Sequence, residues 1–238
     1  MTANLHVFLL IGQSNMSGRG RLEEVALLQD PQVLMFRDGR WMAAEEPLHT
    51  DRPDIAGVGL GMSFAFELLA SGFSGPIGLI PCAVGGTPLS RWMPGEGLYA
   101  HAVATTRLAL SAQPAFPAGT LDGILWHQGE SDSVNVENAN RYGERFQEMI
   151  THLRADLSSA NVPVIAGELG EFLEDNEGCK FYEAINRQLQ ELEGALAQAA
   201  CVSAAGLTDN EDALHFNAQS LREFGRRYAA KFMLLKSA

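Results

Sequence analysis

Short apolar runs recur along this chain and alternate with segments of helical periodicity. Apolar runs of this kind, bounded by glycine or turn residues, are typical of strands that a parallel sheet buries on both faces. They lie at residues 5–11, 33–36, 77–80, 123–126 and 162–166, with a weaker one at 201–204. The helical patterns lie at residues 60–71, 98–112, 136–157, 179–199 and 217–235. The alternation predicts an α/β fold with a parallel sheet and right-handed crossovers.

Two further segments are predicted to lie outside the parallel part of the sheet. The turn residues Asp38 and Gly39 precede Trp41-Met42, which we expect to return as a short hairpin. Residues 44–60 are polar and rich in proline and glycine, which predicts a long surface loop of the kind that often carries function. Because no repeat or linker is evident, residues 1–238 are expected to form a single domain.

Composition excludes several classes of partner. Hydrophobic residues make up 46% of the chain, enough for a substantial core, while 29 acidic and 17 basic residues give a net charge of −12. Such a surface is repelled by phosphate backbones and anionic membranes, so neither nucleic acid nor a membrane is an expected partner.

No apolar run reaches the roughly 18 residues that a transmembrane helix needs, and no signal-peptide pattern opens the chain. Three cysteines at unpatterned spacings argue against disulfides and predict a cytoplasmic protein.

Polar groups follow the first and third predicted strands. Gly12 ends the first apolar run and Ser14 follows it, at the place where open α/β sheets bind ligands. Ser14 therefore stands where a nucleophile would be placed, although serines there also commonly cap turns or helices. After the third strand, Gly85 and Gly86 allow backbone conformations closed to other residues, so that an N–H group can point at a ligand. The alternative for this glycine pair is a plain turn between strand and loop.

A third polar group, residues 126–132, follows the fourth predicted strand. The amide of Gln128 could donate a hydrogen bond to an oxyanion. A metal site built from His127, Glu130 and Asp132 is disfavoured, because the segment lacks the His-Glu-x-x-His pattern and a second nearby histidine. We therefore predict neither a metal nor a cofactor. A buried Glu130 needs a partner, and we expect an arginine such as Arg19 or Arg91.

The fourth group, residues 212–217, precedes the last predicted helix. A separation of three residues places Asp212 and His215 on one side of a turn, where the carboxylate can accept from imidazole Nδ1–H and leave Nε2 free as a base. One assignment then covers all four groups: Ser14 attacks, His215 takes its proton, and Asp212 orients the imidazole. An oxyanion hole is expected from the backbone N–H of Ser14, an N–H of Gly85 or Gly86, and the Gln128 amide.

At these residues the chain resembles the SGNH (GDSL-like) hydrolase superfamily, which is marked by four short blocks around Ser, Gly, Asn and His. It is most similar to the branch that holds carbohydrate esterase family six and the sialate O-acetylesterase (SASA) domain. That branch shows Gly-Gln-Ser-Asn-Met, Gly-Gly-Thr/Ser followed by Arg-Trp, His-Gln-Gly-Glu-x-Asp, and Asp-x-x-His. These motifs stand here at residues 12–16, 85–87 with 91–92, 127–132 and 212–215.

The resemblance implies a flavodoxin-like three-layer α/β/α sandwich and a serine esterase that removes O-acetyl groups from carbohydrates through an acyl-enzyme. By carry-over, Ser14, Asp212 and His215 form the triad. Five other residues are expected to contact substrate or to support the residues that do: Gln13, Asn15, Arg91, His127 and Glu130. Gln13 and Gln128 differ from the wider superfamily, which has Asp and Asn there, but agree with the closer branch.

The substrate class remains open at this level. The expected partner is a small-molecule or oligosaccharide acetyl ester, with acetylated xylan and O-acetyl sialic acid as the two types known in the branch. An esterase, thioesterase or lysophospholipase for another acyl group is the alternative within enzymes. A silent carbohydrate-binding relative is the alternative outside them, and the complete set of proposed catalytic groups argues against it. Oligomeric state is not predicted.

Overall fold

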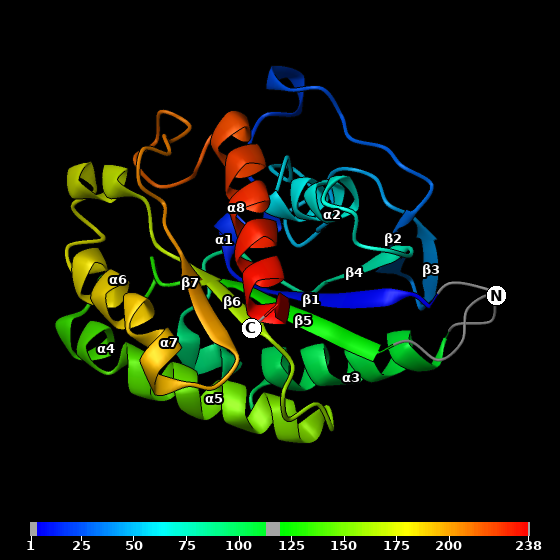
Figure 1. Ribbon diagram of the computed structural model, residues 1–238. Coiled ribbons are helices and arrows are strands. Elements are labelled where there is room, and N and C mark those ends of the chain that lie inside the picture. Colours follow the sequence, from blue (N-terminus) through cyan, green and yellow to red (C-terminus); the bar gives the residue numbers. More distant parts are fainter. Residues whose placement is uncertain (1–3, 113–119, 238) are drawn as a thin grey trace.

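The computed structural model describes residues 4–112 and 120–237 and contains a seven-stranded sheet with helices on both faces (Figure 1). The strand order is β3-β2-β4-β1-β5-β6-β7. All neighbouring strands are parallel except β2 and β3, which form the predicted hairpin. The strands are β1 (His6–Gly12), β2 (Val33–Arg37), β3 (Arg40–Ala43), β4 (Ile77–Pro81), β5 (Thr120–His127), β6 (Val164–Gly167) and β7 (Ala199–Val202). The predicted α/β sandwich with a central parallel sheet is confirmed.

The helices depart from the sequence-based boundaries at two places. The helix predicted over residues 136–157 is divided at Arg141, after the weak helix formers Asn138 and Asn140. The helix predicted over residues 179–199 is also divided, and β7 begins at Ala199, two residues before the predicted strand. The helices are α1 (Ser14–Ser17), α2 (Leu60–Ala70), α3 (Gly97–Ser111), α4 (Val136–Asn140), α5 (Tyr142–Asp156), α6 (Tyr182–Gln190), α7 (Leu192–Ala195) and α8 (Ala218–Ser237), with short 3₁₀ turns at Leu22–Glu24, Leu89–Trp92 and Glu171–Asp175. Within the described ranges, none of these helices is long and apolar enough to cross a membrane.

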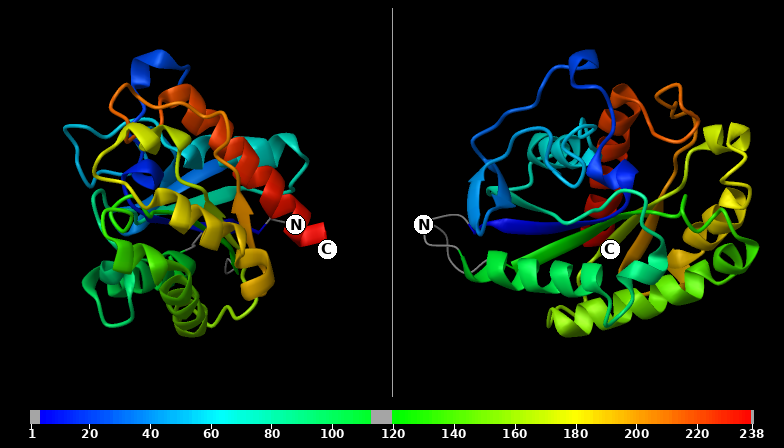
Figure 2. Two further views of the ribbon diagram at one scale, coloured as in Figure 1. Left: turned by 90° about the vertical axis from the view of Figure 1, so that its left-hand side faces the viewer. Right: turned by 180° about the vertical axis from the view of Figure 1, so that it is seen from behind.

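The apolar run of β1 feeds two separate cores, one on each face of the sheet. Val7, Leu9 and Ile11 pack with side chains of α3, α5 and α6, whereas Phe8 and Leu10 pack with α2 and α8. All five are at most 1% exposed. Successive side chains of a strand point to opposite faces, so an unbroken apolar run is what a doubly covered central strand requires. Figures 1 and 2 show α2 and α8 on one face and α3 and α5 on the other.

The end of β1 fixes where the polar groups meet. β1 lies between β4 and β5, and Gly12 pairs with His127 at the carboxyl end of β5. Gly12 has φ +133°, and a Cβ atom there would lie 2.0 Å from the carbonyl oxygen of His127, so only glycine fits. The chain then turns directly into α1, held by a hydrogen bond from Gln13 N to His127 O. Ser14 is thereby placed at the carboxyl edge of the sheet, where such folds bind ligands.

Candidate active site

A pocket of about 380 Å³ opens at the carboxyl edge of the sheet. It lies between α1, the loops after β4 and β5, and the loop that precedes α8. Several predicted residues line it, together with residues from the long loop 44–60 and from the segment after β6: Gln13, Ser14, Arg19, Arg52, Ile55, Gly85, Gly86, Glu130, Ser131, Val134, Asn176, Gly178, Cys179, Leu214 and His215.

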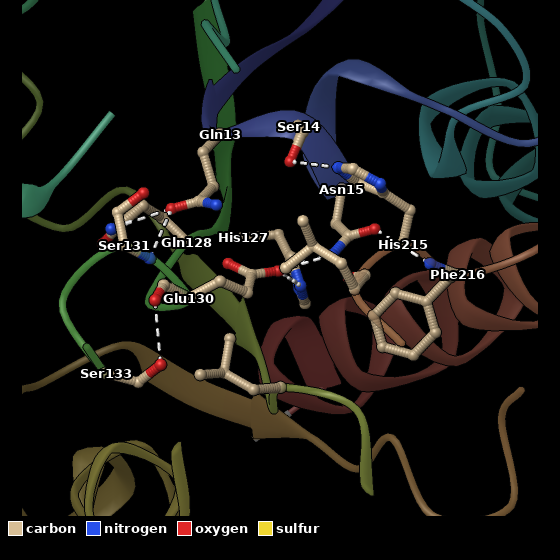
Figure 3. A network of polar contacts seen from close by, with 12 residues as sticks. Gln13, Ser14, Asn15, His127, Gln128, Glu130, Ser131, Ser133, His215 and Phe216 are labelled. Atoms are coloured by element: carbon tan, nitrogen blue, oxygen red, sulfur yellow. Dashed lines mark hydrogen bonds and ion pairs between the residues drawn. The ribbon is translucent and has the colours of Figure 1, made fainter. Parts of the chain in front are cut away.

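The structure brings Ser14, His215 and Asp212 into one chain of hydrogen bonds. The Nε2 atom of His215 lies 3.0 Å from Ser14 Oγ (Figure 3). Its Nδ1 atom lies 2.7 Å from Asp212 Oδ2. The other carboxylate oxygen of Asp212 accepts from the backbone N–H groups of Leu214 and His215, at 2.9 and 2.7 Å. Asp212 therefore fixes both the ring of His215 and the turn that carries it.

The environment of Asp212 favours its ionised form. Burial raises the pKa of this carboxyl group, but the hydrogen bonds from His215 and Leu214 outweigh burial and bring the pKa below its ordinary value. An ionised Asp212 accepts from Nδ1–H, which selects the tautomer whose Nε2 can accept a proton. Ser14, His215 and Asp212 thus stand in the order that acyl transfer needs of a nucleophile, a base and an orienting carboxylate.

The two candidate glycines differ in what their backbone amides do. Gly85 N donates to Asp51 Oδ2 at 2.7 Å, so this N–H is already in use. Gly86 has φ +72°, a left-handed conformation that suits glycine, and open space lies where a side chain would be. Within the described part of the chain, neither Gly86 N–H nor Ser14 N–H has an acceptor. These two amides are free to bind an oxyanion in the pocket.

Gln128 does not face the pocket, so its predicted role as oxyanion donor is wrong. Its Nε2 atom has three acceptors: Asp132 Oδ2 at 2.6 Å, Gln13 Oε1 at 3.1 Å and Thr87 O at 3.1 Å. Because an amide has only two hydrogens, none is left for a ligand. The side chain is also completely buried.

The side chain of Gln13, and not that of Gln128, lines the pocket. Its Oε1 atom accepts from Gln128 Nε2 and, at 3.3 Å, from the backbone N–H of Ser131. A backbone N–H can only donate, so the atom that faces Ser131 is the oxygen, and the nitrogen points away from Ser131 and Gln128 (Figure 3). Since Gln13 lines the pocket, its two N–H donors are available there.

Among the residues that the structure describes, Glu130 has no arginine partner, which corrects the predicted pairing. Arg19 is bound instead to Asp51, at 2.8 Å, and Arg91 is an exposed residue beside Glu96 that does not line the pocket. Glu130 Oε1 accepts from Asn15 Nδ2 at 2.5 Å and lies 3.5 Å from His127 Nε2. Burial raises the pKa of Glu130, but His127 and Asn15 together hold it below its ordinary value. The side chains next to Glu130 are therefore Asn15 of α1, which donates to it, and His127 of β5, which lies close to it.

Sequence reasoning missed a second buried carboxylate, Asp51. It lies in the predicted loop 44–60, where it accepts from Arg19, from Gly85 N and from Ser17 Oγ. Both side chains of the Arg19–Asp51 ion pair are only 5% exposed. Asp51 thereby ties the long loop to α1 and to the glycine pair. The length of the loop indicated function, but no motif distinguishes Asp51 from its acidic neighbours.

The fold and this arrangement are those of SGNH-type hydrolases, with a serine and a histidine at the carboxyl edge of a parallel sheet. The chain belongs to the family described as carbohydrate esterase, sialic acid-specific acetylesterase (SASA), which matches residues 4–234. This confirms the resemblance seen in the motifs.

Known proteins of similar sequence or structure agree with this membership. The chain is 30% identical to a probable carbohydrate esterase of Arabidopsis thaliana over 95% of its own length and 90% of the relative's. An Arabidopsis thaliana protein of known crystal structure shares 30% identity and a TM-score of 0.86, with 98% of each chain covered. NanS shares the fold at 19% identity and a TM-score of 0.78, covering 100% of this chain and 99% of that one. A carbohydrate acetylesterase of Xanthomonas citri does so at 23% identity and a TM-score of 0.66, covering 94% of this chain and 55% of that one.

Proposed function

We propose that this protein is a serine O-acetylesterase that hydrolyses acetyl esters on carbohydrates. The observation that carries the proposal is the hydrogen-bonded chain from Ser14 through His215 to Asp212, with Ser14 and His215 lining a pocket. Membership of a carbohydrate acetylesterase family supports the acetyl group and the sugar alcohol as the two halves of the ester.

In the first step Ser14 Oγ attacks the ester carbonyl carbon while His215 Nε2 takes the hydroxyl proton. The carbonyl π pair moves to oxygen and gives a tetrahedral oxyanion, and Asp212 stabilises the imidazolium that forms. When the oxyanion collapses, the bond to the sugar oxygen breaks and His215 returns its proton to that oxygen. The sugar leaves as an alcohol and an acetyl group stays on Ser14.

In the second step water takes the place of the sugar. His215 Nε2 accepts a proton from water, whose oxygen attacks the acetyl carbon, and the second tetrahedral intermediate expels Ser14 Oγ. The proton passes from His215 to the serine oxygen, and acetic acid is released. Atoms balance as one ester and one water giving one alcohol and one acetic acid, which ionises to acetate in solution.

Three donors are assigned to the oxyanion. Two are the backbone N–H groups of Ser14 and Gly86, and the third is the Nε2 amide of Gln13, because its oxygen is held by Ser131 and Gln128. Gln128 then acts by positioning Gln13 and does not touch the reacting atoms. Donors fixed before the reaction stabilise the developing charge without a cost of reorganisation.

The test is ester hydrolysis by the wild type, Ser14→Ala and Ser111→Ala. Ser111 is exposed at the end of α3, is not among the residues that line the pocket, and serves as the matched control. Wild type and Ser111→Ala should hydrolyse p-nitrophenyl acetate faster than the butyrate or octanoate ester, and Ser14→Ala should be inactive but folded. Release of acetate from acetylated xylan and from O-acetyl sialic acid then identifies the sugar. Faster octanoate turnover would refute the acetyl assignment, and binding without any turnover would favour a silent carbohydrate-binding protein.

A further inference from the structure

We propose that Asn15 is a positioning residue that holds the base His215 in place through its two flanking peptide groups, and that the buried Glu130 holds Asn15. The inference deepens the proposed function and rests on it. Asn15 directly follows Ser14 on α1, so one short segment carries both the nucleophile and the residue that holds His215. We call the contacts of Asn15 with the two peptides that flank His215 the buried clamp.

The contacts of Asn15 enclose His215 on both sides. Asn15 Nδ2 donates to the carbonyl oxygen of Leu214 at 3.1 Å. Asn15 Oδ1 accepts from the backbone N–H of Phe216 at 3.0 Å (Figure 3). These two groups belong to the peptide before His215 and the peptide after it. A single carboxamide therefore fixes the backbone of His215 relative to Ser14.

Glu130 determines which way the Asn15 carboxamide points. The second hydrogen of Asn15 Nδ2 is donated to Glu130 Oε1 at 2.5 Å, and the Glu130 side chain is only 2% exposed. Leu214 O and Glu130 are both acceptors, whereas Phe216 N can only donate, so one orientation of the amide satisfies all three. Asn15 is itself 1% exposed, which leaves water unable to replace these bonds.

This clamp complements the contacts that Asp212 makes. Asp212 binds the ring and the N–H of His215 but is the more exposed carboxylate, with 42% of its side chain accessible. Asn15 and Glu130 act from the buried side of the same turn. A shift of about 1 Å in a catalytic group can cost 100-fold in rate, so losing the buried clamp should be visible in turnover.

The test compares Asn15→Asp and Asn15→Ala with matched changes at Asn186. Asn15→Asp keeps the shape and the acceptor for Phe216 N but removes both donors and places a carboxylate against Glu130. Asn186 makes the same kind of contact elsewhere, with its carboxamide bound to Leu169 N and Leu169 O at 2.8 and 3.0 Å, away from the pocket. Asn186→Asp and Asn186→Ala therefore report what the loss of a backbone clamp costs without an effect on His215.

For both Asn15 variants we expect kcat for p-nitrophenyl acetate, per folded molecule, to fall about 10- to 100-fold while KM changes less than about threefold. The rate at which a fluorophosphonate labels Ser14 should fall in parallel, because that reaction also needs His215. Adding Glu130→Gln to Asn15→Asp should restore part of kcat, since the glutamine amide can donate to the new carboxylate. The Asn186 variants should keep the wild-type kcat even where they lower the unfolding temperature.

Two results would overturn the inference alone: an unchanged kcat in Asn15→Asp, or an equal loss in the Asn186 variants. Activity remaining in Ser14→Ala has a different meaning, because it overturns the proposed function and this inference together. A wild type that neither hydrolyses acetyl esters nor reacts with the fluorophosphonate does the same. The Ser14 and Asn15 variants, measured side by side, thus separate the two failures.

Discussion

The Nε2 atom of His215 lies 3.0 Å from Ser14 Oγ, although 201 positions separate the two residues along the chain. β1 delivers Ser14 to the carboxyl edge of the sheet, and the turn before α8 brings His215 over it. A neutral serine is a weak nucleophile, so in the proposed mechanism Ser14 depends on the proximity of His215 as its base. Activity should therefore depend on every contact that sets the position and tautomer of His215.

Replacement of Asp212 with asparagine tests that dependence. Asp212→Asn can present its amide N–H₂ to His215 Nδ1, which would place the proton on Nε2 and remove the base. We expect kcat to fall about 10⁴-fold, and His215→Ala to fall about 10⁶-fold, with little further loss when the two are combined. Asp212 is partly exposed, so the variant should remain folded in circular dichroism and thermal unfolding. A loss of less than tenfold in Asp212→Asn would contradict the assigned role.

The assignment of the oxyanion donor separates Gln13 from Gln128. Gln13→Ala removes the donor itself, and we expect kcat to fall about 10²- to 10³-fold with KM little changed. Gln128→Ala removes only one of the two contacts that hold Gln13 Oε1, because Ser131 N remains, so its loss should be smaller. Gln190→Ala, at the exposed end of α6, is the control. A larger loss in Gln128→Ala than in Gln13→Ala would reverse the assignment.

Much of the fold and the residues of the site could be predicted from sequence because their signals are local. The apolar run of β1 identifies a doubly covered strand, and polar residues after parallel strands must gather at one edge of the sheet. Ser14 and the pair Gly85 and Gly86 were placed at this edge in this way, and the three-residue spacing of Asp212 and His215 indicated their contact. Boundaries failed where helices divide, since weak helix formers such as Asn138 and Asn140 do not by themselves determine whether a helix ends.

The partners of buried polar groups could not be predicted from sequence. Gln13 and Gln128 both reach the same edge, and only the acceptors Asp132 and Thr87 show which amide is already occupied. In the same way, Glu130 accepts from Asn15, a contact between residues 115 positions apart. Sequence gives the residue types near a site, but hydrogen-bond direction depends on tertiary geometry.

His49 should make the protein less stable in mild acid. It is fully buried, its two ring nitrogens lack partners among the described residues, and burial lowers its pKa to about 4, although the Asp51 charge opposes this in part. In the unfolded chain His49 has a pKa near 6.5, so between that value and about 4 only the unfolded state binds the proton. The free energy of unfolding that neutral His49 contributes is therefore fully present above pH 6.5. As the pH falls from that value through about 4, the free energy of unfolding drops by roughly 3 kcal/mol in all.

Urea unfolding across this pH range checks the effect. His49→Leu removes the titrating group and should flatten the fall in unfolding free energy between about pH 6.5 and 4. His152→Gln, which changes an exposed histidine on α5, should keep the wild-type slope. Equal slopes in the wild type and His49→Leu would show that the acid sensitivity has another origin.

Gly12 should be irreplaceable for folding as well as for placing Ser14. Gly12→Ala forces a side chain into a left-handed conformation at φ +133° and against the His127 carbonyl oxygen, 2.0 Å away. Gly39→Ala is the matched control, because Gly39 also has a positive φ, +74°, but no atom of the described residues lies within 4 Å of the added Cβ. We expect Gly39→Ala to lose about 1–2 kcal/mol in urea unfolding from backbone strain alone, and Gly12→Ala to lose several kcal/mol more. Equal losses in the two variants would mean that the close approach of Gly12 on β1 to His127 on β5 can be relieved with no loss of unfolding free energy. That contact would then not hold Ser14 in place.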